Sequence, residues 1–200
     1  AVKTFFIKLY EKGLIYRGNR LINWCPECGT SLSDAEVEHE DRNGKYWYFR
    51  YPAVDGGEGI VVATSRPETM FADEAIAVHP DDERYKDIVG KKVIVPLLGK
   101  EIPVITDIYP DPEKGTGAVK ITPAHDPNDF EVGNRAGLGR PTCIDMEAKM
   151  TAAAGKYEGM DRYECRKAWV ADLEEAGYLV KTEEKVIPAG ECYRCHTVIE

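Results

Sequence analysis

The sequence has no long hydrophobic run and no segment that marks it for export. Its longest apolar stretches are only a few residues, such as Val93–Val95, far below the length of a membrane span. A secretory signal would need a basic start followed by an apolar segment, and neither occurs at the N-terminal end. We therefore expect a cytoplasmic protein with no membrane partner.

Positive charge is also scarce. The chain has 26 Lys and Arg against 35 Asp and Glu, which gives a formal net charge of −9. A general nucleic-acid clamp carries excess positive charge, so this balance argues against bulk electrostatic binding but allows a local basic site. A length of 200 residues with 43% hydrophobic residues is typical of one globular domain, with or without a small attachment. We expect a monomer.

Two segments have the periodicity of amphipathic helices. The first dozen residues place apolar side chains at i, i+3, i+4 and i+7, and Gly13 is a natural stop. A helix this short cannot bury its own apolar stripe, so we expect it to lie at the edge of something larger. A second helix is predicted between an Asp161 cap and Gly177, with a stripe formed by Cys165, Ala168, Trp169, Leu173 and Ala176.

The segment between these helices has the pattern of short strands. The Arg42–Gly44 segment is a turn signal, and the aromatic run 46–51 that follows it favours a strand. Further runs at 60–63, 92–96, 102–105 and 118–121 are separated by Gly and Pro. Many short strands with such breaks predict a closed or strongly bent sheet.

The cysteines form two pairs with metal-ligand spacing, Cys25/Cys28 and Cys192/Cys195. Two thiolates in one tight turn can hold one side of a tetrahedral ion, and two such turns complete a structural zinc site. Loop closure becomes costlier only slowly with length, so the long separation is no objection. We predict one Zn²⁺ on all four cysteines; unliganded or redox pairs are the alternative.

Two segments are dense in small polar and charged residues. One is TSRPET at residues 64–69, directly after an apolar run, and the other runs from 115 to 130. Strand alternation places Lys120 and Thr122 on one face, and Asp126 and Asp129 share a face of the turn or helix that follows. Spacing alone predicts a polar pocket and no specific reaction. An isolated Asp-x-x-Asp is usually a helix cap or a pair of solvated acids, and a lone histidine such as His125 is usually structural.

Taken together, these motifs resemble the editing domain, called connective peptide 1, that is inserted into the catalytic domain of class I valyl-tRNA synthetases. The resemblance rests on TSRPET at 64–69, GTGAV at 115–119, AHDPNDFEVG at 124–133, DDERY at 81–85 and AGKY at 154–157. It covers nearly the whole chain, including both cysteine pairs. Ser65 stands where a second threonine is usual and Ala72 where glycine is common.

The resemblance implies an α+β fold: a β-barrel-like editing domain with peripheral helices, and a zinc-ribbon stem joining the termini. The implied divisions are residues 1–42 for the N-terminal helix and first half of the stem, 43–186 for the editing domain and 187–200 for the second half. The first helix and residues 14–24 would belong to the edge of the host catalytic domain. The implied reaction is hydrolysis of Thr-tRNA(Val), so the partners would be the tRNA(Val) 3′ end carrying threonine and the remainder of the parent synthetase.

The resemblance also assigns residues to roles. Asp129 would hold the substrate α-ammonium, with Lys120 and Arg66 as the other catalytic residues; the implied substrate-binding residues are Asp126, Thr122, Thr64, Ser65, Thr69 and His125. ATP and Mg²⁺ would serve only the parent enzyme, because the ATP-site signatures His-Ile-Gly-His and Lys-Met-Ser-Lys-Ser are absent from this chain. A leucyl- or isoleucyl-type editing domain and a non-catalytic, zinc-stapled module that positions tRNA are the alternatives.

Overall fold

A computed structural model describes all residues 1–200. The chain folds into α-helices α1 (Val2–Glu11), α2 (Pro127–Ala136) and α3 (Arg162–Glu175) and strands β1 (Asn23–Cys25), β2 (Thr30–Leu32), β3 (Val37–Tyr51), β4 (Ile60–Thr64), β5 (Ala75–Val78), β6 (Lys92–Ile94), β7 (Glu101–Thr106), β8 (Ala118–Ile121) and β9 (Leu179–Cys192). Short 3-10 helices are η1 (Asp34–Glu36), η2 (Pro67–Ala72), η3 (Glu83–Tyr85) and η4 (Ala152–Tyr157). Neither the length nor the hydropathy of any helix suffices to cross a membrane.

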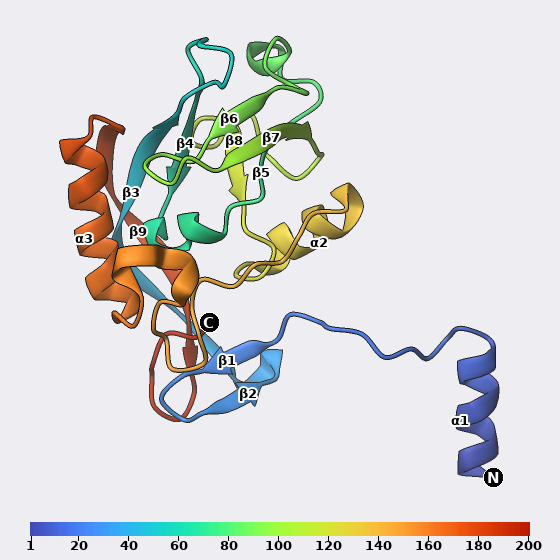
Figure 1. The fold of residues 1–200 in the computed structure, drawn as a ribbon. Helices are drawn as coiled ribbons and strands as arrows, with labels where there is room; N and C mark the ends of the chain where they lie inside the picture. The colour runs from blue at the N-terminus through green and yellow to red at the C-terminus, as the bar shows by residue number, and fades with distance from the viewer.

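A long two-stranded ribbon connects the two ends of the molecule. β3 and β9 pair antiparallel from Val37 opposite Cys192 to Phe49 opposite Leu179. The ribbon begins beside the small β1–β2 hairpin and runs into the body of the protein (Figure 1). The predicted divisions at residues 42 and 187 therefore fall inside continuous strands.

The predicted turn at Arg42–Gly44 is wrong, because all three residues are paired within this ribbon. Gly44 lies opposite Lys185, and a Cβ placed on it would come 2.6 Å from the Ile187 Cδ1 atom. The glycine thus allows a neighbouring side chain to cover the strand. From the local sequence, a glycine that makes room for a neighbouring side chain cannot be distinguished from a glycine that forms a turn.

The body contains two open sheets rather than a closed barrel, which corrects the barrel-like prediction. One sheet has the order β4-β3-β9 and the other the order β6-β7-β5-β8, with β5 and β7 parallel. The main ladders leave these sheets separate, and a single isolated bridge joins Ala53 to Val93. The four strands of the second sheet are short, and Pro96 and Pro123, which follow β6 and β8, have no N–H with which to lengthen those two strands.

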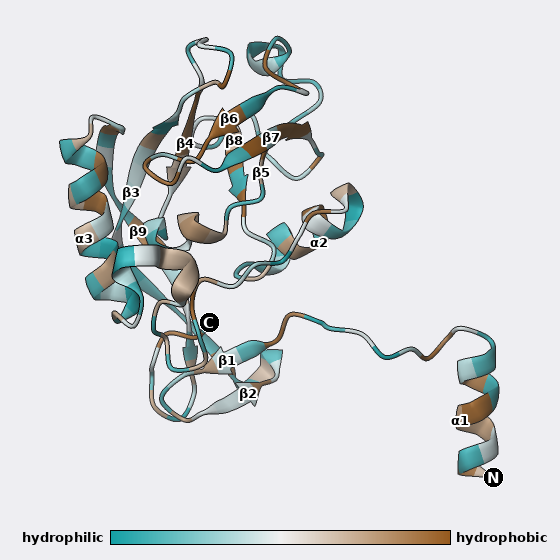
Figure 2. Cartoon of the chain, in the orientation of Figure 1, coloured by the Kyte–Doolittle hydropathy of each residue, from teal (hydrophilic) through white to brown (hydrophobic).

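The hydrophobic core combines buried residues of both sheets with those of α3, which packs against η2 and β9 (Figures 1 and 2). As predicted, Asp161 caps α3, since its side chain accepts hydrogen bonds from the first turn. Of the predicted stripe, Cys165, Trp169 and Leu173 are buried and Ala168 is half-buried, whereas Ala176 is exposed. Trp169 packs against Phe71 with ring centroids 4.6 Å apart. The core thereby anchors η2, which carries part of the polar pocket.

The predicted N-terminal helix is present as α1, but it has no buried residue. It stands apart from the body at the end of an extended segment (Figure 1). The stem is instead built from residues 23–32 and the C-terminal segment, where Trp24 and Glu200 exchange backbone hydrogen bonds of 2.8 and 2.9 Å. The prediction that the stem joins both termini is therefore right only for the C-terminal end.

Candidate functional site

All nine non-cysteine residues predicted from the sequence line one cavity of about 380 Å³. These residues are Thr64, Ser65, Arg66, Thr69, Lys120, Thr122, His125, Asp126 and Asp129. They come from the end of β4, the start of η2, the end of β8 and the start of α2. Tyr46 and Tyr109 also contribute to its wall. The fold thus gathers into one place two motifs that lie about 50 residues apart in the sequence.

Asp126 and Asp129 occupy the N-terminus of α2 in different ways. Asp126 is the N-cap, and its Oδ1 accepts hydrogen bonds from the backbone N–H groups of Asn128 and Asp129 at 2.8 and 3.1 Å. Pro127 at the first helical position suits this start, because the missing N–H would have no intrahelical partner. The Asp126 Oδ2 atom makes no hydrogen bond within the protein and is available to a ligand.

Asp129 points inward from the first turn of α2 and is only 6% exposed. Its Oδ2 accepts a 2.8 Å hydrogen bond from the backbone N–H of Thr122. Burial raises the pKa of Asp129 to about 7, with the Asp126 charge adding to the effect and Lys120 opposing it. A cationic ligand group would favour its ionised form, so the carboxyl is suited to receive an ammonium.

Lys120 and Thr122 lie on one face, as strand alternation predicted, and the Lys120 Nζ donates to the Thr122 Oγ1. Behind them lies Asp73, which the sequence motifs did not reveal. Its Oδ1 is 2.9 Å from the Lys120 Nζ, and the side chain is completely buried. The available signal was weak: an acid shortly before the apolar run of β5, eight residues after Ser65.

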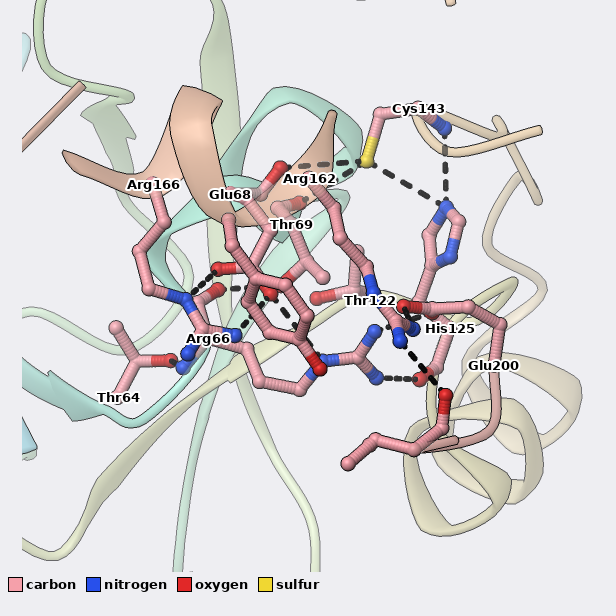
Figure 3. Close-up of polar contacts among 12 residues, drawn as sticks. Thr64, Arg66, Glu68, Thr69, Thr122, His125, Cys143, Arg162, Arg166 and Glu200 are labelled. Carbon is pink, nitrogen blue, oxygen red and sulfur yellow. Dashed lines mark hydrogen bonds and ion pairs between the residues drawn. The ribbon is translucent and has the colours of Figure 1, made fainter. Parts of the chain in front are cut away.

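Arg66 is fixed by acceptors from three separate segments (Figure 3). Its guanidinium donates to the Glu200 carboxylate and, at 3.0 Å, to the backbone oxygen of His125, and it lies 3.5 Å from the Glu68 carboxylate. Glu68 belongs to the TSRPET motif but had no role predicted from the sequence, and Glu200 had no sequence signal. The Glu200 carboxylate belongs to the stem, so this ion pair links the stem to the pocket.

The same network continues toward α3 (Figure 3). Arg166 binds the buried Glu68 carboxylate in a bidentate manner, with distances of 2.7 and 2.6 Å. Arg162, which is 3% exposed, binds the Glu200 carboxylate and donates to the Val198 backbone oxygen at 2.7 Å. Each buried carboxylate therefore has two cationic partners, which offsets the cost of removing it from water.

The hydroxyl groups of the TSRPET segment differ in their availability. The Thr64 Oγ1 accepts from the Arg66 backbone N–H at 3.0 Å, and the Thr69 Oγ1 donates to the Arg66 backbone oxygen at 2.9 Å. These two side chains shape the start of η2. The Ser65 hydroxyl makes no hydrogen bond within the protein, so it can bind a ligand.

The His125 side chain is committed to the protein. Its Nε2 accepts a 2.9 Å hydrogen bond from the Cys143 backbone N–H, which places the single proton of the neutral ring on Nδ1. Burial, followed by the nearby Arg66 charge, lowers the pKa of His125 to about 4. His125 is therefore neutral at physiological pH, and its Nε2 holds the backbone at Cys143 in place.

The four cysteines predicted to bind metal come together in the stem. Their sulfur atoms all lie within 4.8 Å of one another, with Cys25 to Cys195 at 3.5 Å and Cys28 to Cys192 at 4.0 Å. Sulfurs bound 2.3 Å from a tetrahedral Zn²⁺ are about 3.8 Å apart, so the arrangement fits such an ion. Both turns are tight, with Gly29 at φ +60° and His196 at φ +57°.

A larger cavity of about 640 Å³ lies between η4, α3 and the turn at Leu97 and Leu98. Aromatic and aliphatic side chains form most of its wall, including Phe71 and Trp169. It contains none of the predicted site residues. Polar and titratable groups converge in the smaller cavity instead, which makes the smaller cavity the better candidate for a functional site.

Comparison with known proteins supplies the family. The sequence model of class I tRNA synthetases (I, L, M and V) matches residues 1–190. This chain belongs to the class I tRNA synthetases. It is 59% identical to the valine–tRNA ligase of Symbiobacterium thermophilum and 56% identical to that of Thermotoga maritima, over all of its 200 residues. It covers 22% and 23% of those proteins, so it spans between a fifth and a quarter of their length.

A solved structure of the same class shares the fold. A LeuRS from Agrobacterium radiobacter, determined in a ternary complex with tRNA and LeuAMS, superimposes with a TM-score of 0.56 at 18% sequence identity. The match covers 98% of this chain and 35% of the LeuRS chain. The family predicted from the sequence motifs is therefore confirmed, and the synthetase fragment has the fold of a piece of a larger enzyme.

Proposed function

We propose that this chain is the inserted editing domain of a valyl-tRNA synthetase and hydrolyses the ester between threonine and the 3′ end of tRNA(Val). Water adds to the ester carbonyl, the bond to the ribose oxygen breaks, and threonine and uncharged tRNA are released. The observation that supports this most strongly is the convergence of all nine predicted polar residues on one cavity. We name tRNA(Val) as the tRNA because the relatives of this chain are valine–tRNA ligases.

Threonine is the expected amino acid because it has nearly the shape of valine. An apolar synthetic pocket rejects an added hydroxyl only about a hundredfold, a general limit for which valyl-tRNA synthetase is itself the standard example. A second site must therefore recognise the hydroxyl by hydrogen bonding, so that valine would leave buried polar groups unpaired. Asp126, which is half-buried in the cavity wall, offers its unused Oδ2 as the acceptor for that hydroxyl.

In this proposal Asp129 receives the α-ammonium of the threonyl group. The buried carboxyl already has a pKa of about 7, so an incoming cation would draw it into its ionised form. Lys120 and Thr122 form the adjacent floor, where the Lys120 ammonium can stabilise negative charge that develops on the ester. Arg66 contributes a fixed positive charge at the cavity wall.

A thiol nucleophile has no support from the site. Cys143 is the nearest thiol, but its side chain is fully buried, and burial raises its pKa to about 12. A thiol in this state contains little thiolate at neutral pH. A positioned water that attacks the carbonyl, with the developing charge stabilised electrostatically, is therefore the proposed route.

We also propose a structural Zn²⁺ on Cys25, Cys28, Cys192 and Cys195, and contact between α1 and the remainder of the parent synthetase. Phe5 and Tyr10 of α1 are 65% and 61% exposed. A packing partner outside this chain would cover them. ATP, Mg²⁺ and aminoacylation would belong to the parent, and the fragment is expected to be a cytoplasmic monomer.

The experiment is deacylation of Thr-tRNA(Val) by the purified chain, by Asp129→Ala and by Lys120→Ala. Both variants should lose most activity, whereas Asp87→Ala at an exposed site should retain it. Near-wild-type rates for both site variants would refute the residue assignment. Preference for norvalyl- or valyl-tRNA would indicate a leucyl- or isoleucyl-type domain, and tRNA binding without hydrolysis would indicate the positioning module.

A further inference from the structure

The buried Asp73 side chain lies directly behind the cavity and makes hydrogen bonds with three other side chains. Its Oδ2 accepts a hydrogen bond from the Tyr51 hydroxyl at 2.7 Å, and its Oδ1 lies 2.9 Å from the Lys120 Nζ and 3.2 Å from the Thr122 Oγ1. Asp73 itself does not line the cavity, whereas Lys120 and Thr122 do. The two floor residues therefore stand between Asp73 and any ligand.

The buried pair fixes where the Lys120 charge lies. The Lys120 side chain is 8% exposed and that of Asp73 is 0% exposed, so the ammonium has little contact with water and the carboxylate has none. Removing one partner would leave the other charge buried without compensation, which is far less favourable than the intact pair. The position of the Asp73 carboxylate thus determines the position of the ammonium at the cavity floor.

The same carboxylate sets the direction of the Thr122 hydroxyl. An ionised carboxylate has no proton, so the Thr122 hydroxyl must donate to the Asp73 Oδ1. The Lys120 ammonium has no lone pair and cannot accept a hydrogen bond, so it must donate to the Thr122 oxygen. The Thr122 oxygen is left as an acceptor only, and it can meet a ligand group that donates a proton, such as a hydroxyl or an ammonium.

We propose that Asp73 is a positioning residue of the editing site, which acts through Lys120 and Thr122 to give the cavity floor its fixed ammonium and its acceptor polarity. The inference rests on the proposed function for its effect on catalysis. Its structural part, the dependence of the Lys120 ammonium on Asp73, is independent of which reaction the cavity carries out.

The first test is a double-mutant cycle with Asp73→Asn, Lys120→Met and the double variant, assayed by kcat and KM for Thr-tRNA(Val). Asp73→Asn should lower kcat by about tenfold or more, the size expected for residues coupled in one ion-pair network. In the Lys120→Met background the same change should cost less than about twofold. Losses that multiply in the double variant would overturn the inference, because Asp73 would then act independently of Lys120.

The milder variant Tyr51→Phe tests the same network if Asp73→Asn does not fold. It removes the hydrogen bond to the Asp73 Oδ2 and leaves the Oδ1 contacts in place. It should lower kcat by a smaller factor, and this loss should also disappear in the Lys120→Met background. Tyr51→Phe and Lys120→Met effects that multiply would contradict the proposal.

The second test does not depend on activity. The Nζ–H signals of Lys120 in ¹⁵N-lysine-labelled protein should be observable in the wild type, because the ammonium is buried and hydrogen-bonded. They should be absent in Lys120→Met, altered or lost in Asp73→Asn, and unchanged in the exposed control Asp87→Asn. An unchanged Lys120 signal in folded Asp73→Asn would overturn the inference. An inactive wild-type chain with the expected signals would refute the proposed function alone.

Discussion

Asp129→Asn should stabilise the protein at alkaline pH while it abolishes editing. The wild-type carboxyl has a pKa of about 7 in the folded protein, against 3.8 as its ordinary value. The folded state therefore binds more protons than the unfolded state between these pH values, and the free energy of unfolding falls as pH rises through this window. Asparagine does not titrate and so escapes this loss.

The magnitude follows from the two pKa values. Their difference corresponds to about 4 kcal/mol, reached only above pH 7, where both states of the wild type are ionised. The Asp129 side chain is almost fully buried, so solvent screening reduces this little. Asparagine also retains a carbonyl oxygen that can accept the Thr122 N–H, so the helix start should be preserved.

The assay is urea unfolding of the wild type and Asp129→Asn at pH 4, 6 and 8. The variant should be close to the wild type at pH 4 and more stable by several kcal/mol at pH 8. Asp87→Asn, at an exposed position, should show no such trend. A difference between Asp129→Asn and the wild type that does not change with pH would refute the reasoning.

Three further predictions concern the stem, the ion-pair network and His125. The chain should hold one equivalent of zinc by elemental analysis, and Cys28→Ser should lower both the zinc content and the melting temperature. Arg166→Met should destabilise the protein by about 3 kcal/mol in urea unfolding because it strips the buried Glu68 of its bidentate partner, whereas Arg194→Met at an exposed pair should cost under about 1 kcal/mol. His125 should remain neutral down to pH 5 in an NMR titration, since its pKa is about 4; its contribution to stability is complete above pH 6.5 and is lost as pH falls toward 4.

Each of these has a clear contrary result. Zinc far below one equivalent would contradict the metal site. Equal destabilisation by Arg166→Met and Arg194→Met would contradict the importance of the buried network. A His125 ring that titrates near pH 6.5 would show that its Nε2 is not held by the Cys143 N–H.

The sequence alone determined the features that depend on near neighbours. The Asp161 and Asp126 caps, the stripe of α3 and the two cysteine turns each involve side chains only a few positions apart, where backbone geometry leaves few choices. Family resemblance then identified the residues of the cavity, because their motifs are long and specific.

Only the tertiary structure decided the features that depend on distant partners. Gly44 lies in a strand because it pairs with Lys185 of β9, where the Ile187 side chain covers it. The two sheets stay open because no continuous ladder joins them, and Asp73 matters because Lys120 lies against it. A local sequence pattern shows that a residue is a glycine or an acid, but not which side chain from a remote segment it meets. That choice is made by packing across the whole chain, where burial determines which charges must be paired and which can remain available to a ligand.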